Sequence, residues 1–133
     1  MNKIVKFGGS SLADATQFKK VAKIIKSDES RRFVVPSAPG KRFSEDIKVT
    51  DLLYQAYNAK DNKTFETIFN QIKHRFQNII DELNLDLSLE NEFKVIKKAF
   101  LEKVGIDYAA SRGEYLNGIV LANYLGFEFI DAS

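Results

Sequence analysis

Residues 3–40 read KIVKFGGSSLADATQFKKVAKIIKSDESRRFVVPSAPG, and their pattern indicates the fold class more clearly than any other part of the chain. The apolar run at 3–7 has the length of a strand and stops at two glycines, whereas residues 12–27 place apolar side chains at helical spacing. A second short apolar run at 33–35 ends at a proline. The order strand, glycine turn, helix, strand is typical of a βαβ unit, whose two strands we expect to be parallel.

The rest of the chain is mainly helical in pattern. The periodicity predicts a turn at 27–32, an irregular loop at 36–50, helices over 50–57, 64–83, 90–104 and 111–125, and a third strand over 127–131. A parallel sheet needs cover on both faces and usually has more strands than these. We therefore expect a fragment of a larger α/β domain.

Composition narrows the function classes. The chain has 133 residues, of which 44% are hydrophobic and 29% charged, as in a soluble globular domain. With 20 basic and 18 acidic residues the net charge is +2, which does not favour a nucleic-acid or membrane partner. The lack of cysteine excludes disulfides, a thiolate zinc site and a cysteine nucleophile. No run approaches the ~20 apolar residues of a membrane span, and a cytoplasmic protein is the default expectation.

The first candidate site is the glycine turn after the first strand. The backbone N–H groups of Gly8, Gly9 and Ser10 can cradle phosphate oxygens beside a helix N-terminus, and Lys6 supplies a positive charge next to them. Such groups suit phosphoryl transfer, in which a protein mainly positions the reactants and neutralises charge. The alternative is a plain tight turn with Ser10 or Ser11 as the helix N-cap, and Ser11 with Asp14 fits a relaxed capping box.

The second and third candidate sites follow the second strand and open the last helix. Ser37 and Thr50 carry hydroxyls that can hold a carboxylate or phosphate, although Thr50 also fits an N-cap of the following helix. Glu114 in Ser-Arg-Gly-Glu at 111–114 can hold a substrate ammonium, and Arg112 can pair with an acidic substrate group. Ser-x-x-Glu is also a capping box, and spacing alone favours that interpretation.

Other motifs in the sequence give weaker indications of function. The glycine turn lacks the second half of G-x-G-x-x-G, and Pro-Gly-Lys-Arg at 39–42 lacks the leading glycine and the Ser or Thr of a Walker loop. His74 falls on the polar side of its helix without a neighbouring ligand, which indicates a solvated side chain rather than a metal ligand. No metal site is expected.

In combination, the three sites resemble the aspartokinases, within the amino-acid kinase family. The matching segments are KFGGSS at 6–11, VVPSAPGKR at 34–42, KVTDLL at 48–53, SRGEYL at 111–116 and FIDA at 129–132. Together they cover the whole chain. The resemblance implies an amino-acid kinase (carbamate kinase-like) fold, a three-layer αβα domain with a mainly parallel sheet, of which residues 1–133 would be the N-terminal part.

The resemblance also implies an activity, which is phosphoryl transfer from ATP–Mg²⁺ to the β-carboxylate of L-aspartate. The product, 4-phospho-L-aspartate, starts the biosynthesis of lysine, threonine and methionine. The roles implied for matching residues are catalysis by Lys6, phosphate binding by Lys6, Gly8, Gly9 and Ser10, and substrate binding by Ser37, Thr50 and Glu114, with Glu114 on the aspartate ammonium.

Aspartokinases are several times longer than this chain. The resemblance therefore places the main nucleotide site, the metal-binding acid and the regulatory domains outside residues 1–133, and implies a homo-oligomer at full length and an inactive isolated fragment. Two alternatives remain: a kinase of another small acid, such as N-acetylglutamate or carbamate, and a non-catalytic binding or regulatory domain.

Overall fold

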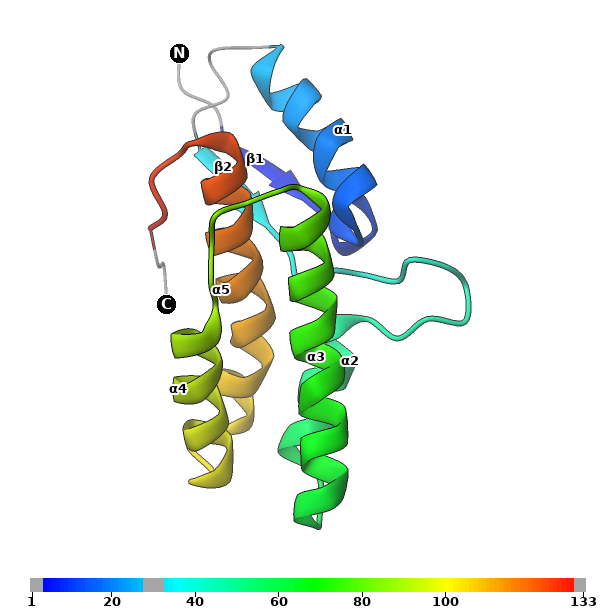
Figure 1. Cartoon of the computed structure of the whole chain (residues 1–133), viewed down its shortest axis with the longest axis vertical. Helices are drawn as coiled ribbons and strands as arrows, with labels where there is room; N and C mark the ends of the chain where they lie inside the picture. The colour runs from blue at the N-terminus through cyan, green and yellow to red at the C-terminus, as the bar shows by residue number, and fades with distance from the viewer. Residues whose placement is uncertain (1–3, 28–32, 131–133) are drawn as a thin grey trace.

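A two-stranded parallel sheet lies at one end of a group of long helices (Figure 1). The computed structural model describes residues 4–27 and 33–130. The predicted turn at 27–32 lies outside the described residues from 28 onward. The elements in chain order are β1 (Ile4–Phe7), the 3-10 helix η1 (Gly9–Leu12), α1 (Ala15–Lys26), β2 (Phe33–Pro36), α2 (Val49–Tyr57), α3 (Asn62–Glu82), α4 (Glu90–Leu101) and α5 (Ile106–Leu125).

The βαβ unit predicted from residues 3–40 is confirmed. β1 and β2 pair in parallel, with Ile4 opposite Phe33 and Phe7 opposite Pro36. α1 begins at an N-cap aspartate, Asp14, whose carboxylate accepts the N–H of Gln17 at 3.1 Å. The capping box expected at Ser11 is therefore wrong, because η1 takes up Ser11 and the cap falls three residues later.

Only one face of this sheet is covered by the described residues. On the other face Ile4 is 77% exposed, Phe33 is 50% exposed and Val35 is 42% exposed, and Lys6 shares that face. The described residues are thus a mostly helical part of an α/β fold with a small parallel sheet.

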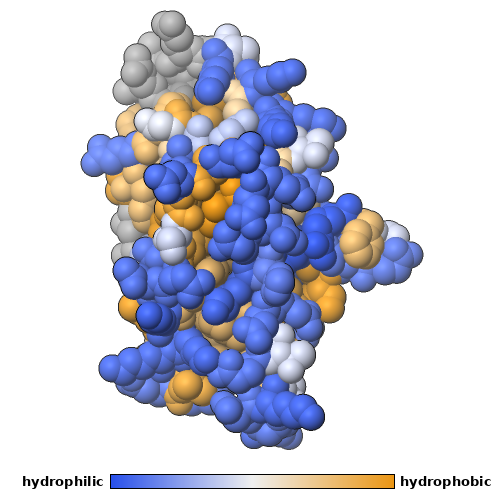
Figure 2. Space-filling model, in the orientation of Figure 1, coloured by the Kyte–Doolittle hydropathy of each residue, from blue (hydrophilic) through white to orange (hydrophobic). Residues whose placement is uncertain are grey.

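The helices enclose a phenylalanine-rich core, and α3 carries the stripe that its sequence predicted. Along α3, the side chains of Phe65, Phe69, Ile72 and Phe76 are each no more than 4% exposed. The ring of Phe69 packs edge-on against those of Phe93 and Phe100, 6.3 and 6.2 Å between centroids, which joins α3 to α4. In Figure 2 the hydrophilic residues cover most of the visible face, and hydrophobic surface gathers between α5 and α3.

Two predicted helix boundaries and one predicted strand are wrong. α4 ends at Leu101 instead of 104, and Val104 is 54% exposed rather than inward. α5 begins at Ile106, five residues before the expected start, with Gly105 at its N-cap instead of at the end of α4. Residues 127–130 form no strand, and the remainder of the expected third strand lies outside the described residues.

The segment after α5 folds back on its own helix instead of forming the expected third strand. Gly126 ends α5 in the left-handed conformation, with φ 73°, and the N–H of Phe127 donates back to Ala122 O at 2.9 Å. The ring of Phe129 then packs against Tyr115 of α5, with 5.7 Å between centroids. In the described residues this segment therefore follows its own helix and has no neighbouring strand.

Candidate active site

The loops that follow β1 and β2 meet through their backbones. Ser37 N–H donates to Phe7 O at 3.0 Å, and Gly40 N–H donates to Gly9 O at 2.8 Å. Because the strands are parallel, both loops leave the sheet at its carboxyl edge, where open α/β sheets bind ligands. The first two candidate sites therefore lie side by side.

Two of the loop glycines are required by this close approach. A Cβ on Gly40 would lie 2.6 Å from the carbonyl carbon of Gly9, and a Cβ on Gly9 would lie 2.9 Å from Ala38 O. A Cβ on Gly8 would meet nothing within 4 Å. Gly9 and Gly40 thus let the loops touch, whereas Gly8 leaves open space at the exposed side of the turn.

Lys6, Gly8 and Ser10 are all exposed at this edge. Lys6 is the next-to-last residue of β1 and stands opposite Val35 in the strand register. The N–H of Ser11 donates to Gly8 O at 3.1 Å, which closes the turn into η1. The structure gives no contact of Lys6 with the other candidate residues, so its part in a common site stays a prediction.

The loop between β2 and α2, residues 37–48, is called the second loop, and it is fixed to the start of α2. The N–H of Val49 donates to Pro39 O at 3.0 Å, which places the half-buried Thr50 in the first turn of α2 close to the loop that carries Ser37. Lys48, not Thr50, occupies the N-cap position. The prediction of Thr50 as an N-cap is therefore wrong, and its hydroxyl is not used for capping.

Glu114 lies on an exposed face in the middle of α5. Since α5 begins at Ile106, Ser111 and Glu114 cannot form a capping box, and the Ser111 Oγ instead donates to Tyr108 O at 2.7 Å. That interpretation of Ser-x-x-Glu is wrong. Within residues 4–27 and 33–130, no hydrogen bond or ion pair occupies the Glu114 carboxylate.

α5 is held against the second loop at two points. The Asn117 Nδ2 donates to Ser37 O at 2.7 Å, and Asn117 is fully buried. One turn earlier, a Cβ on Gly113 would lie 2.6 Å from the Cβ of Ala38. The segments that carry Ser37, Thr50 and Glu114 therefore converge. Asn117 has an unusual second feature, because its buried Oδ1 finds no hydrogen-bond partner in the described part of the chain.

Arg112, on the same turn as Glu114, is enclosed by aromatic rings. Its guanidinium lies 4.6 Å from the ring centroid of Tyr108 and 4.4 Å from that of Tyr115, and it donates to Ser111 Oγ. Its side chain is 8% exposed. The pairing with an acidic substrate group stays a prediction, and the contacts named here hold the buried guanidinium against residues of α5.

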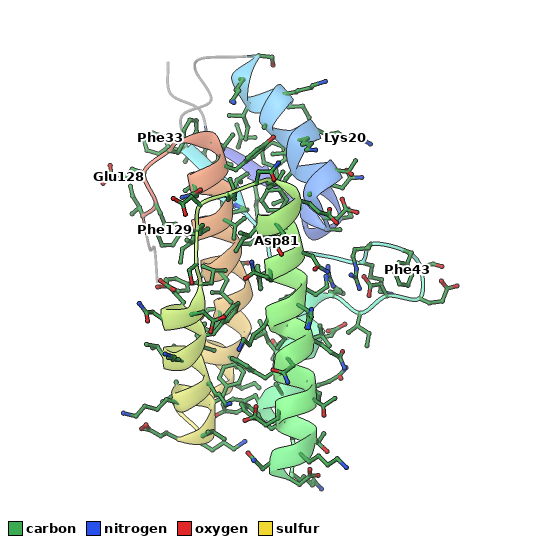
Figure 3. All side chains as sticks on the ribbon, viewed as in Figure 1. Lys20, Phe33, Phe43, Asp81, Glu128 and Phe129 are labelled. Atoms are coloured by element: carbon green, nitrogen blue, oxygen red, sulfur yellow. The ribbon has the colours of Figure 1, made fainter. Side chains whose placement is uncertain are left out.

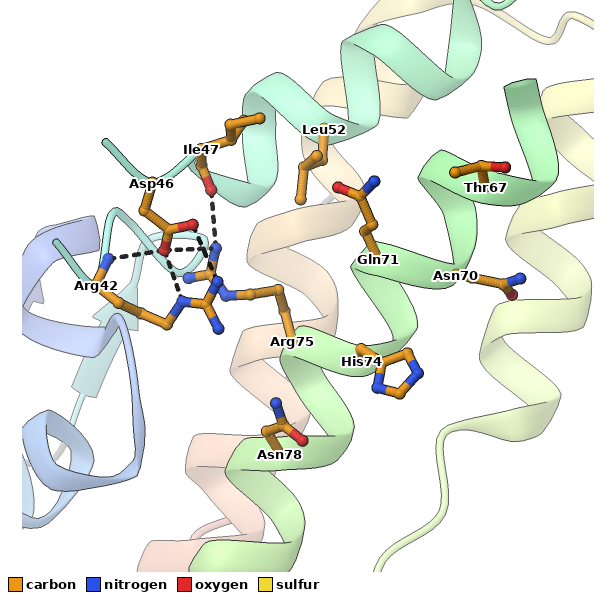
Figure 4. A pocket seen from close by; sticks show the side chains of 10 residues that line it. All are labelled: Arg42, Asp46, Ile47, Leu52, Thr67, Asn70, Gln71, His74, Arg75 and Asn78. Carbon is orange, nitrogen blue, oxygen red and sulfur yellow. Dashed lines mark hydrogen bonds and ion pairs between the residues drawn. The ribbon is translucent and has the colours of Figure 1, made fainter. Parts of the chain in front are cut away.

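Arg75, a buried arginine that was not among the candidate residues from the sequence, holds the loops together through hydrogen bonds to their backbone carbonyls. Arg75 of α3, 5% exposed, donates through Nη2 to Gly40 O at 2.6 Å and Ala13 O at 3.2 Å. Through Nη1 it donates to Ile47 O at 2.8 Å, a hydrogen bond that Figure 4 shows. The only signal in the sequence is a charged residue within the apolar stripe of α3, between Ile72 and Phe76.

Asp46 supplies the negative charge beside this arginine. Its carboxylate accepts two hydrogen bonds from the Arg42 guanidinium, at 2.6 and 3.0 Å, and lies 3.6 Å from Arg75 Nη1. The hydrogen bond from Arg42 holds the pKa of Asp46 far below its usual range, and Arg75 adds to this effect. Burial lowers the pKa of Arg75 from its very high ordinary value, with the nearby Arg42 charge acting in the same direction and Asp46 opposing it.

A pocket of about 270 Å³ opens on the outer side of this cluster, between α3 and the second loop. Its lining includes Arg42, Asp46, Arg75 and His74, and none of the seven predicted site residues (Figure 4). His74 is exposed on the polar side of α3, as predicted. The described residues contain no group of three or more His, Asp or Glu side chains placed to hold a metal ion.

The fold and the loops define a class: an α/β domain with two joined glycine-bearing loops at the carboxyl edge of a parallel sheet. The chain belongs to the amino acid kinase family, whose model matches residues 1–132. No helix in the described part of the chain is long and apolar enough to cross a membrane.

The relatives at hand are aspartokinases. Aspartokinase 3 of Bacillus subtilis (strain 168) is 35% identical over 139 residues, a match that covers 98% of this chain and 30% of that protein. The bifunctional aspartokinase/homoserine dehydrogenase of Buchnera aphidicola is 34% identical over 109 residues, covering 75% of this chain and 12% of that protein. The chain thus spans less than a third of the length of the curated relatives it matches.

Two solved structures of aspartate kinases also match nearly the whole of this chain, which again covers less than a third of each. The aspartate kinase of Clostridium acetobutylicum superimposes with a TM-score of 0.89 at 51% sequence identity, covering 97% of this chain and 30% of that one. Aspartokinase III of E. coli, in complex with aspartate and ADP, gives 0.79 at 21% identity over 95% of this chain and 29% of that one. The second likeness supports the fold alone.

Proposed function

We propose that this chain forms the N-terminal part of an aspartate kinase, which transfers the γ-phosphoryl group of ATP–Mg²⁺ to the β-carboxylate of L-aspartate. The observation that carries the proposal is the joining of the glycine loop, the second loop and the middle of α5 by short backbone and side-chain contacts. The aspartate kinase of Clostridium acetobutylicum, at 51% identity over 97% of the chain, supports the same function.

In this proposal Lys6 is the catalytic cation. Its ammonium neutralises charge that builds up on the phosphoryl oxygens in the transition state, while Gly8, Gly9 and Ser10 present backbone N–H groups to the phosphates. Lys6 and the glycine loop suit this role because they are exposed at the carboxyl edge of the sheet.

The acceptor is held by the other two segments. Ser37 and Thr50 bind aspartate through their hydroxyls, and the Glu114 carboxylate binds the aspartate ammonium. The Glu114 carboxylate, which is exposed and has no hydrogen bond or ion pair to another described residue, supports this role. So does the Thr50 hydroxyl, which lies in the first turn of α2 and is not used for capping.

The chemistry needs no general base. One oxygen of the ionised β-carboxylate attacks the γ-phosphorus, the bond from phosphorus to the bridging oxygen breaks, and ADP leaves with that oxygen's electron pair. The product is an acyl phosphate, and no proton has to move. The protein's work is to align the two anions and to offset their repulsion.

ATP and Mg²⁺ enter as one substrate complex. E. coli aspartokinase III has been solved in complex with aspartate and ADP, which are the acceptor and the nucleotide product of the proposed reaction. We propose that residues 1–133 supply the substrate side of the three-layer domain, that chain outside them supplies most of the nucleotide site and regulation, and that the full-length protein is a cytoplasmic homo-oligomer.

Trapping with hydroxylamine tests this proposal. Acyl phosphates react with hydroxylamine to give hydroxamates, so the full reading frame should form a hydroxamate from ATP and L-aspartate. N-Acetylglutamate and carbamate serve as competing acceptors, because an acylated amine gives Glu114 no ammonium to bind. A product with those acids but not with aspartate would replace the proposal with a related kinase, and none with any acceptor would favour a non-catalytic domain.

A further inference from the structure

The contact set of Arg75 is unusual for a buried arginine. Its three short hydrogen bonds all go to backbone carbonyls, and these belong to three separate segments: Ala13 after η1, and Gly40 and Ile47 at the two ends of the second loop. A buried charge is normally paired with an acidic side chain, and here Asp46 is 3.6 Å away and already bound to Arg42. The guanidinium therefore serves mainly to hold backbone.

We propose that Arg75 is a positioning residue of the kinase site, which fixes the glycine loop and the second loop to each other and to α3. This inference rests on the proposed function and adds a residue that none of the three site motifs contains. The Arg75 guanidinium donates a hydrogen bond to Gly40 O, and the N–H of Gly40 donates to Gly9 O. The phosphate-binding turn and the loop of Ser37 are thus linked through one glycine.

The shape of the side chain matters as well as its charge. A guanidinium is planar and donates several N–H bonds in fixed directions, whereas the lysine ammonium is a compact point charge on a flexible stem. Lysine at position 75 can keep the charge near Asp46, but it cannot reach three carbonyls that lie in different directions. Arg75→Lys therefore separates positioning from charge.

The first experiment measures whether the two loops are joined and does not depend on enzymatic activity. In the wild-type protein, amide hydrogen exchange of Gly40 and Val49 should be slowed at least ~100-fold relative to an open loop, because both amides are hydrogen-bonded in the joined loops. Arg75→Lys should speed exchange at these two amides by ~10-fold or more and leave the amide of Glu102, at the end of α4, unchanged. Unprotected wild-type amides, or equal acceleration at all three positions, would overturn the proposal.

The second experiment measures kinetics in the full-length protein. Arg75→Lys and Arg75→Met should lower kcat/KM for aspartate by about 10²-fold, the effect of a shift of about 1 Å between reacting groups. Lys73→Met is the control: it removes a charge from the same helix at a half-exposed site and should leave kcat and the KM for aspartate unchanged. If Arg75→Lys lowers the midpoint of thermal unfolding but leaves kcat and KM as in wild type, Arg75 is merely structural and the proposal fails.

The two proposals fail in different ways. If the wild-type protein does not phosphorylate aspartate, the proposed function is wrong, and the exchange measurement still decides whether Arg75 joins the loops. If Arg75→Met does not fold, Arg75→Lys and the wild-type exchange pattern carry the test.

Discussion

A methyl group at Gly40 should force the two site loops apart. In Gly40→Ala the new Cβ would lie 2.6 Å from Gly9 C and 2.8 Å from Ser10 N. Both are backbone atoms, which cannot rotate away, and ordinary contact begins near 3.4 Å. The loops must therefore separate by about 0.8 Å at this point. The Gly40–Gly9 hydrogen bond would lengthen from 2.8 Å to about 3.6 Å, which is too long for a hydrogen bond.

The expected loss of stability follows from these two effects. Overpacking a tight contact costs about 1–3 kcal/mol and the lost hydrogen bond about 1 kcal/mol, so Gly40→Ala should lower the free energy of unfolding by about 2–4 kcal/mol. Urea unfolding followed by circular dichroism measures this in the 133-residue chain. In the full reading frame, kcat/KM should fall by about 10²-fold.

Gly8→Ala is the matched control. A Cβ on Gly8 would meet nothing within 4 Å, and its φ of −75° suits alanine. This variant should unfold within about 0.5 kcal/mol of wild type. If Gly40→Ala is as stable as Gly8→Ala, the two loops do not touch as described, and the convergence of the candidate site is refuted.

Three further predictions follow from the site. Glu114→Gln should raise the KM for aspartate about 10- to 100-fold by removing a charge-assisted bond, with stability unchanged; a change in stability alone would restore a structural role. Asp46→Asn tests the lowered pKa of Asp46: folding protects the ionised form, so the stabilisation is present above pH ~4 and is lost as the pH falls below that value. The stability gap between wild type and Asp46→Asn, from urea unfolding at several pH values, should therefore shrink in acid, and a constant gap would contradict the assignment. Asn117→Ala leaves the Ser37 carbonyl without its donor and should cost about 1–3 kcal/mol by the same assay, and an unaltered unfolding midpoint would show that this bond contributes nothing.

The βαβ unit and the stripe of α3 could be predicted because their signals are local. Apolar spacing within one element reports the face that will be buried, and a short connection limits how two strands can pair. The start of α5 gave no such signal. Its buried side includes Ala109, Gly113, Asn117 and Gly118, so small and polar residues interrupt the apolar period.

Two predictions from short motifs failed because each motif needs a structural setting that the chain does not provide there. Ser-x-x-Glu at 111–114 fits a capping box only at a helix start, and the helix begins five residues earlier. Phe127–Ile130 is apolar enough for a strand, but a strand also needs a neighbour with free backbone groups. In the described residues the segment packs on α5 through Phe129, which Figure 3 shows beside that helix.

The role of Arg75 is beyond sequence reasoning for a different reason. Its partners are carbonyl groups 28, 35 and 62 residues away, and every residue has a carbonyl whatever its side chain. A charged residue in an apolar stripe indicates that something must satisfy it, but not what. Only the fold brings Ala13, Gly40 and Ile47 to one guanidinium.

The turnover number of Lys6→Ala, measured in the full reading frame with ATP and L-aspartate, tests the proposed phosphoryl transfer most directly. We expect kcat to fall by at least ~10²-fold, the scale of losing one preorganised charge at a developing anion. Because Lys6 is exposed, the variant should keep the wild-type unfolding midpoint. A variant with wild-type kcat would contradict the claim that the edge of this sheet carries phosphoryl transfer.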